Sequence, residues 1–362
     1  MAPTERIAVV GAGIIGCAIA FELSRRGAAV SVFDGRSLGG GATQASAGIL
    51  APYIEAHEGG PLFELTVRGL SAYDRFVRQL RAVSPIPFEY GRPGTLEIAE
   101  DAGRARELRA RLSARWAASA GLEWLDAERL EALVRCIHTG AVGALLCAVH
   151  GYVAAGPFIA AMADAAQRLG ARFHLGTAVT GVDLESSGVC VDTAGESTTA
   201  DRVVLCAGSW TPAIDPLRQT ADRIRPVRGQ LVRLSAPELR LRHVLWGRSC
   251  YIVPWHDGTL LVGATSEDVG FDERTTAEGV RGLLTAAEGL IPDLRSATFV
   301  DVRAGLRPAT VDELPILGPA GDPRIIYAAG HYRNGVLLAP FTAQLISNYV
   351  FDSVIDPAFS AT

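Results

Sequence analysis

The chain opens with two apolar segments that are separated by a glycine-rich turn and an amphipathic stretch. Residues 7–10 and 29–33 are largely apolar and rich in β-branched side chains, which is typical of buried strands. The apolar residues between them fall on one face of a predicted helix that ends at Gly27, namely Ile15, Ala18, Ile19 and Leu23. The pattern therefore predicts a strand–helix–strand unit that ends at Asp34.

Farther along the chain, helical and strand patterns alternate and then change in kind. Predicted helices lie at 61–83, 101–120, 151–169, 275–290 and 335–349, and a short one begins at Asp126. Predicted strands lie at 96–99, 171–176, 178–184, 188–193, 199–206, 226–234, 251–254, 259–265, 300–305, 306–308 and 324–330. The strands between 225 and 305 follow one another closely and predict an antiparallel sheet, whereas the flanking strand–helix–strand units predict a parallel one.

These two patterns predict an α/β protein with two interleaved domains. A Rossmann-like, dinucleotide-binding domain is predicted from residues 1–84, 150–222 and 305–362. An α+β substrate domain with an antiparallel sheet is predicted from residues 85–149 and 223–304. Hydrophobic residues make up 49% of the 362 positions, which is ample for the cores of two such domains.

The glycines after the first predicted strand have the spacing of a dinucleotide-binding fingerprint. Gly11 permits the tight turn, Gly13 lets a pyrophosphate approach the backbone, and Gly16 lets the helix pack closely on the sheet. The pyrophosphate would lie at the positive end of the helix dipole. Asp34 is placed to accept hydrogen bonds from the ribose of an adenosine, and it would repel a 2′-phosphate.

Composition excludes several kinds of chemistry. The chain has no lysine, which excludes lysine Schiff bases and a P-loop. The net charge of −5 and the lack of a long basic run argue against nucleic acid and anionic membranes as partners. The six scattered cysteines form no CxxC pair, so buried thiols in a reducing cytoplasm are expected, and no metal site is predicted. The apolar N-terminal stretch lacks the basic flank of a signal peptide and is too short for a membrane span.

Several further motifs complete the pattern. Residues 39–52 are small and polar and then apolar, so a flat ligand could lie close to their backbone; a flexible loop is the alternative interpretation. With the fingerprint and with the motifs at 203–210, 250–254, 304–308 and 329–335, the chain resembles the FAD-dependent D-amino-acid oxidase superfamily over nearly its full length. Within it, the resemblance is greatest to the glycine oxidases of thiamine biosynthesis.

The resemblance implies that the dinucleotide is FAD. The chain shows no cysteine anchor of the family's type, so the FAD is expected to be bound non-covalently. The residues implied to bind it are Gly11, Gly13, Ile14, Ile15, Gly16, Asp34, Thr43, Gln44, Ala47, Gly48, Leu50, Val179, Ala207, Gly208, Trp210, His331, Arg333, Asn334, Gly335, Val336 and Leu337.

The resemblance also implies a clamp for a substrate carboxylate. Arg307 would bind it, because a guanidinium can bond both carboxylate oxygens, and Tyr251 would donate a second bond. Arg333 would lie on the loop that closes over flavin and substrate. The alternatives are an ion pair of Arg307 with Asp312 or Glu313, a plain strand tyrosine at 251, and a structural or flavin-side role for Arg333.

The activity implied is the oxidation of glycine and other small amines, such as sarcosine and D-alanine, to the imine or 2-oxo acid, with oxygen reduced to hydrogen peroxide. The family needs no side chain as general base, because the flavin takes the hydride from a neutral amine. The imine would supply thiazole synthesis, so thiazole synthase is a candidate partner.

Two departures from the glycine oxidase pattern concern the substrate pocket. Ser266 stands where that pattern has a methionine, and Ser249 stands where it has a histidine. Two other functions remain open: a dehydrogenase of the same fold that passes electrons to another acceptor, and a flavin-binding module that modifies tRNA, which the acidic charge disfavours. The sequence does not decide the best substrate or the electron acceptor. It also does not decide the oligomeric state, for which a homo-oligomer is one candidate.

Overall fold

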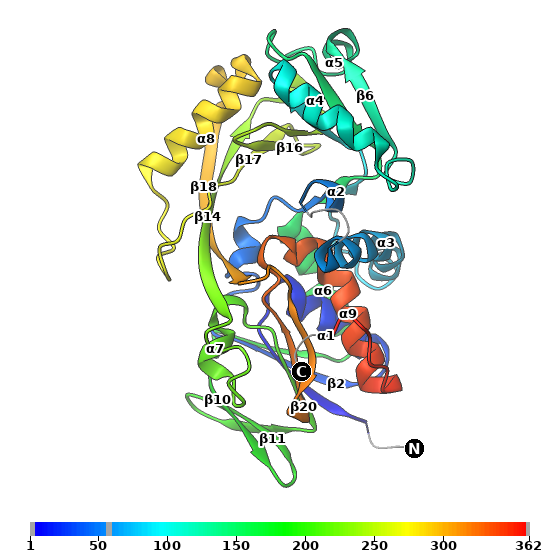
Figure 1. Ribbon diagram of the computed structural model, residues 1–362. Coiled ribbons are helices and arrows are strands. Elements are labelled where there is room, and N and C mark those ends of the chain that lie inside the picture. The colour runs from blue at the N-terminus through cyan, green and yellow to red at the C-terminus, as the bar shows by residue number, and fades with distance from the viewer. Residues whose placement is uncertain (1–3, 56–59, 360–362) are drawn as a thin grey trace.

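The computed structural model describes residues 4–55 and 60–359, whose strands form two large and two small sheets (Figure 1). The six-stranded sheet has the order β19–β20–β13–β1–β2–β9 and is parallel except for β19. Its strands are β1 (Arg6–Val10), β2 (Ala29–Asp34), β9 (Arg172–Leu175), β13 (Arg202–Leu205), β19 (Ile316–Ala320) and β20 (Asp322–Ala329). This is the Rossmann-like sheet that the N-terminal pattern predicts.

Both faces of the six-stranded sheet are covered. The face that carries Ile7 and Val9 packs against α1 (Ile14–Arg25), α6 (Ala155–Arg168) and α9 (Gly335–Asp352), and α3 (Pro61–Arg81) packs on α9. The face that carries Ala8 and Val10 packs against a three-stranded sheet of β10 (Val179–Glu185), β11 (Gly188–Thr193) and β12 (Ser197–Ala200). Because both faces are buried, β1 reads as a continuous apolar run.

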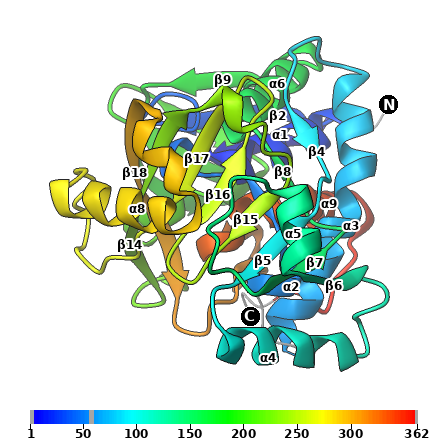
Figure 2. The same ribbon diagram turned by 90° about the horizontal axis from the view of Figure 1, so that it is seen from above.

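The eight-stranded sheet has the order β18–β14–β17–β16–β15–β5–β7–β6 (Figure 2). Its strands are β5 (Thr95–Ala99), β6 (Leu122–Asp126), β7 (Gly143–Cys147), β14 (Ile224–Ser235), β15 (Val244–Trp246), β16 (Tyr251–Pro254), β17 (Thr259–Gly263) and β18 (Thr298–Thr310). Helix α8 (Ala277–Leu290) packs across β14 and β17, while α4 (Ala102–Ala110) and α5 (Ala127–Leu133) pack at the β5–β7–β6 end. All strand pairs but β15 with β5 are antiparallel, as predicted.

Short elements connect the two large sheets. A second small sheet joins β3 (Ile49–Leu50), β8 (Gly151–Val153) and β4 (Tyr90–Gly91). The remaining helices are α2 (Pro52–Glu55) and α7 (Thr211–Ile214), and the 3₁₀ turns are η1 (Ala42–Ala45), η2 (Arg111–Ser113), η3 (Gly208–Trp210), η4 (Pro237–Leu239), η5 (Pro292–Ser296) and η6 (Tyr332–Asn334). β14 and β18 are long strands of the eight-stranded sheet, and together they extend to the level of the six-stranded sheet (Figure 1).

Two predicted helices are wrong at one end. The helix predicted over 101–120 ends at Ala110 and is followed by a 3₁₀ turn. Burial overrides helical propensity there, because Ala120 enters the core and Trp116 stacks on Tyr53 with ring centroids 4.9 Å apart. The helix predicted over 151–169 begins only at Ala155, since the residues before it pair as β8 with β3 and β4.

Two predicted strand boundaries are also wrong. The strand predicted over 199–206 is divided at Asp201, whose carboxylate accepts hydrogen bonds from the backbone N–H and the guanidinium of Arg6. The segments predicted at 300–305 and 306–308 form one strand, β18, which continues to Thr310 because residues 301–310 pair without interruption with β14. The division of the chain into two domains stays a prediction, and β18 crosses its boundary at residue 305.

Within residues 4–55 and 60–359, none of the helices combines the length and the apolar character that crossing a bilayer requires.

Candidate active site

A cavity of about 700 Å³ is lined by strand ends from both large sheets. Its volume lies in the range of about 300–1,000 Å³ that is usual for cofactor and substrate pockets. At one end it is lined by the turn between β1 and α1, with the ends of β2 and β13. At the other end it is lined by β16, β17 and β18, with the segment between β20 and α9.

The glycines of the fingerprint turn are required by close packing. Gly11 has a φ of +117°, and a Cβ there would overlap the carbonyl oxygen of Cys206. A Cβ on Gly16 would overlap the carbonyl oxygen of Gly11, so this glycine lets α1 pack against the turn. Gly13 precedes α1 and lines the cavity, and no side chain caps the helix at this residue. The positive end of α1 therefore faces the cavity.

The residues around this turn fit a dinucleotide such as FAD. The N–H of Ile14 donates to Thr43 Oγ1 at 3.1 Å, which ties η1 to the start of α1. Asp34 Oδ2 accepts from the N–H of Ala12 at 2.7 Å, and Oδ1 accepts from the N–H of Arg36 at 2.8 Å. A carboxylate fixed at the cavity wall and a helix N-terminus that faces the cavity are the groups that hold ribose and pyrophosphate in such sites.

Arg36 is a feature of the cofactor end that the sequence analysis missed. Its guanidinium lies 4.1 Å from the ring centroid of Trp210 and forms an ion pair of 2.9 Å with Glu273. Glu273 belongs to the loop between β17 and α8, so this ion pair links that loop to the segment that follows β2. Because the partner is 237 residues away in the sequence, no local pattern could reveal the contact.

Arg307 is held at the opposite end of the cavity by two features of the backbone. Its guanidinium lies over Gly229 of β14, where a Cβ would overlap it. Its Nη1 donates to the carbonyl oxygen of Thr265 at 3.0 Å. Among the described residues it makes no ion pair with Asp312 or Glu313, so the alternative of a structural ion pair is wrong. Arg307 lines the cavity, where its charge is available to an anion.

Tyr251 has a similar arrangement on β16. It pairs across the strands with Gly263 of β17, and a Cβ on that glycine would overlap the tyrosine ring and hydroxyl. Gly229 and Gly263 thus clear the space in which the two predicted clamp side chains lie. Neither glycine was predicted to shape the site, although a glycine inside a strand is a known sign of close approach.

The segment between β20 and α9 brings the third predicted catalytic residue to the same cavity. Arg333 is exposed, lies over the ring of Tyr332 and donates from Nη2 to its hydroxyl at 3.1 Å. His331 is 3% exposed, and its Nε2 lies 3.0 Å from Thr342 Oγ1. Burial lowers the pKa of His331 to about 3, so the ring is neutral at ordinary pH. The buried, neutral ring is suited to a structural role rather than a catalytic one.

The cavity brings together most of the residues predicted for cofactor and substrate. Those that line it are Gly11, Gly13, Ile14, Ile15, Asp34, Thr43, Ala47, Gly48, Val179, Ala207, Gly208, Trp210, Ser249, Tyr251, Ser266, Arg307, His331, Arg333, Asn334, Gly335, Val336 and Leu337. Three predicted residues are not part of the lining: Gly16 is covered by the turn, Leu50 is fully buried in the core, and Gln44 is exposed and donates to the carbonyl oxygen of Ala304. Contact of any of these residues with FAD or substrate stays a prediction.

The lining is cationic at the substrate end. Arg307 and Arg333 contribute positive charge there, whereas Arg248 forms an ion pair with Asp101, and Asp34 is the one carboxylate among the described lining residues. Asp34 lies at the cofactor end.

Of the residues that the structure describes, no three His, Cys, Asp or Glu side chains gather as a metal ion would require.

A family model described as "FAD dependent oxidoreductase" (DAO) matches residues 6–349 of the chain. The chain belongs to this family. This confirms the prediction of an FAD-dependent enzyme, and the α/β fold with its parallel sheet at the fingerprint agrees with it.

Similar proteins include glycine oxidases. The glycine oxidase of Geobacillus kaustophilus is 34% identical over 347 residues, which are 95% of this chain and 92% of that protein. The crystal structure of glycine oxidase from that species has a TM-score of 0.92 at 33% identity and covers 99% of both chains. The bifunctional protein ThiO/ThiG of Nostoc is 35% identical over 99% of this chain, which spans only 54% of that protein. The predicted resemblance to glycine oxidases is therefore confirmed.

This oxidoreductase is expected to release intact FAD when it is denatured. Cys206 and Cys250 line the cavity, but Cys206 Sγ donates to the carbonyl oxygen of Val10 at 3.2 Å, and burial raises the pKa of the Cys250 thiol to about 12. Because the thiolate is the reactive form, neither cysteine is suited to a flavin linkage. Acid precipitation should leave yellow FAD in the supernatant, identified by its chromatographic mobility. Flavin that stays in the washed pellet would contradict non-covalent binding.

Proposed function

We propose that this oxidoreductase oxidises glycine and other small amino acids and amines, such as sarcosine and D-alanine. The observation that carries the proposal is the placement of Arg307 and Tyr251 in the same cavity as the fingerprint turn. An arginine over a glycine, held through one N–H and otherwise facing a cavity, suits a substrate carboxylate. The similarity to glycine oxidases supports the same substrate class.

The proposed reaction converts the amine to an imine and reduces oxygen to hydrogen peroxide. With glycine, the overall change is glycine, oxygen and water to glyoxylate, ammonia and hydrogen peroxide. FAD, when bound, supplies the acceptor for the two electrons that leave the substrate carbon. The residues of the chain bind and orient the amino acid so that its Cα faces the cofactor end of the cavity.

The charges of the lining suit a neutral amine. Arg307 binds the carboxylate, and Tyr251 is placed to donate a further hydrogen bond to it. Arg333 adds positive charge to the lining, which disfavours a bound ammonium group and so lowers the pKa of the substrate amine. The amine proton can therefore leave before oxidation, and the reaction needs no general base from the side chains.

A supply of imine for thiazole synthesis is the proposed context of the reaction. It is supported by the similarity to the ThiO part of the Nostoc bifunctional protein, where one polypeptide also carries ThiG. Thiazole synthase is accordingly a proposed partner, and the cytoplasm is the proposed location. Oxygen is the proposed electron acceptor, and one molecule of peroxide formed per amine consumed in air is the corresponding measurement.

Replacement of Arg307 tests the clamp. Arg307→Ala should raise KM for glycine and lower kcat/KM by about tenfold to a hundredfold, because a charge-assisted hydrogen bond is worth about 1.5–3 kcal/mol. Arg307→Lys, which keeps the charge without the fork, should recover only part of this loss. The FAD content, read from the visible spectrum, should match the wild type. Near-normal kinetics in Arg307→Ala would remove Arg307 from the substrate site.

Replacement of Ser266 tests the size of the pocket. A methionine at this position would fill space in the cavity that the serine leaves open. Since a buried methylene contributes about 0.8 kcal/mol, Ser266→Met should lower kcat/KM for sarcosine and D-alanine several-fold relative to glycine. L-Amino acids should remain poor substrates in both proteins. Unchanged ratios among the three substrates would show that Ser266 does not shape the pocket.

A further inference from the structure

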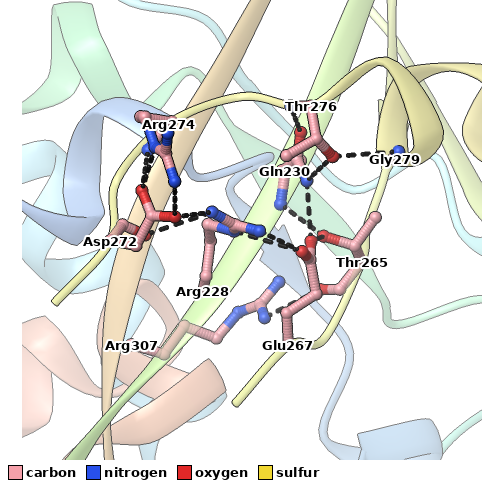
Figure 3. A network of polar contacts seen from close by, with 9 residues as sticks. All are labelled: Arg228, Gln230, Thr265, Glu267, Asp272, Arg274, Thr276, Gly279 and Arg307. Carbon is pink, nitrogen blue, oxygen red and sulfur yellow. Dashed lines mark hydrogen bonds and ion pairs between the residues drawn. The ribbon is translucent and has the colours of Figure 1, made fainter. Parts of the chain in front are cut away.

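The loop between β17 and α8, residues 264–276, is held by a network of polar contacts around Arg228 (Figure 3). Arg228 lies on β14 and is 4% exposed. Its guanidinium forms ion pairs with Glu267 and, at 3.0 Å, with Asp272. Backbone hydrogen bonds of 2.9 Å in both directions also join Arg228 to Glu267. A buried arginine on the rigid sheet thus fixes two points of an irregular loop.

Glu267 is the centre of this network. Its carboxylate accepts hydrogen bonds from the guanidinium of Arg228, from Gln230 Nε2 at 2.7 Å and from Thr265 Oγ1 at 2.5 Å. Burial alone would raise the pKa of Glu267, but these hydrogen bonds outweigh it and lower the pKa. The carboxylate is therefore ionised at neutral pH, and its charge is compensated within the network.

The network ends at Arg307. Thr265 Oγ1 donates to Glu267 and accepts from the backbone N–H of Gln230 at 2.8 Å, so both neighbours fix the threonine. The carbonyl oxygen of the same threonine accepts from Arg307 Nη1 at 3.0 Å. Figure 3 shows the chain of contacts from Arg228 through Glu267 and Thr265 to the guanidinium of Arg307.

Gln230 extends the same support to helix α8. Its side-chain oxygen accepts from the N–H of Thr276 at 2.8 Å, and Thr276 caps α8 by accepting from the N–H of Gly279 at 3.2 Å. Gln230 has no exposed surface. The loop is thus fixed near its beginning by Glu267 and at its end by Thr276, and both contacts are made by neighbouring residues of β14.

We propose that Glu267, with Arg228 and Gln230, positions Arg307 for the substrate carboxylate by holding the Thr265 carbonyl in place. The inference rests on the proposed function, since it assigns these residues to the same clamp. Loss of the Glu267 charge weakens its contacts with Arg228 and with the Thr265 hydroxyl, which keeps its bond to the backbone N–H of Gln230. The Thr265 carbonyl is then held less firmly, so the acceptor that fixes the direction of the Arg307 guanidinium shifts. The three residues contribute through Arg307 and are positioning residues.

Glu267→Gln is the direct test, because it keeps the shape and removes the charge. A displacement of about 1 Å at a binding group costs up to a hundredfold, so KM for glycine should rise about tenfold to a hundredfold, while kcat changes less. Asp268→Asn is the matched control. It removes the same charge from the next residue of the loop, where Asp268 forms an exposed ion pair with Arg225. Its KM should stay within about twofold of the wild type, since exposed ion pairs contribute little.

A second variant and a binding measurement separate positioning from folding. Thr265→Val keeps the carbonyl and the shape but removes the hydroxyl that Glu267 binds, so it should raise KM in the same direction without a change of charge. Acetate is the probe for the clamp, with its dissociation constant measured from the absorbance change of the bound FAD. Both variants should weaken acetate binding about as much as they raise KM, at wild-type FAD content and thermal stability.

Two results would overturn the positioning role. One is wild-type acetate affinity and wild-type KM in both Glu267→Gln and Thr265→Val, while Arg307→Ala binds acetate more weakly and has a raised KM. The other is an equal rise of KM in Asp268→Asn, which would assign the effect to net charge. A wild-type protein that binds acetate through Arg307 but oxidises no small amine would instead reject the proposed function, and the acetate measurements would still test the positioning role.

Discussion

The antiparallel pairing of β14 with β18 is the constraint on which the cavity depends. Its register places Gly229 opposite Gly305, and Arg307 lies two residues farther along β18, with its guanidinium back over Gly229. Gly305 lets η1 approach β18, since a Cβ there would lie only 3.0 Å from the Cβ of Ala45. A shift of one residue would turn Arg307 to the other face of the sheet. This register therefore positions the cavity wall that carries Arg307, and it also positions the contact of that wall with η1.

The way Arg307 is held explains how it can be both rigid and available. A carboxylate partner would fix the guanidinium but would also neutralise it and compete with a substrate anion. A backbone carbonyl fixes the guanidinium through one N–H and leaves its positive charge in place. The carboxylate that rigidifies this region, Glu267, is instead paired with Arg228. The Thr265 carbonyl therefore orients the guanidinium, while Arg307 keeps its positive charge for the substrate.

The sequence predicts the cofactor end better than the substrate end, and the reason is physical. Gly11, Gly16 and Asp34 lie within one strand–helix–strand unit, so their spacing alone reflects the geometry of the site. The parallel and antiparallel sheets also follow from local patterns. The support of the clamp does not, because the residues in contact come from distant strands and from a loop without periodicity.

The features that the sequence predicts wrongly or not at all have the same physical origin. The helix predicted past Ala110 yields to the burial of Ala120 and the stacking of Trp116 on Tyr53, and the contact of Arg36 with Glu273 joins segments that are far apart in the chain. The motifs around Arg307 and Tyr251 predict the clamp through resemblance, whereas Gly229 and Gly263, which make room for these two side chains, belong to no motif that points to the site. Tertiary packing decides these features, and only the folded chain displays them.

The central claim is that the carboxylate of the substrate, held by Arg307, orients the amine for oxidation. The most direct measurement compares kcat/KM for glycine with that for methylamine, which is glycine without its carboxylate. A clamp worth about 2.7 kcal/mol or more corresponds to a preference for glycine of at least about a hundredfold, and this preference should largely disappear in Arg307→Ala. Equal activity of the wild type on the two amines would contradict the account.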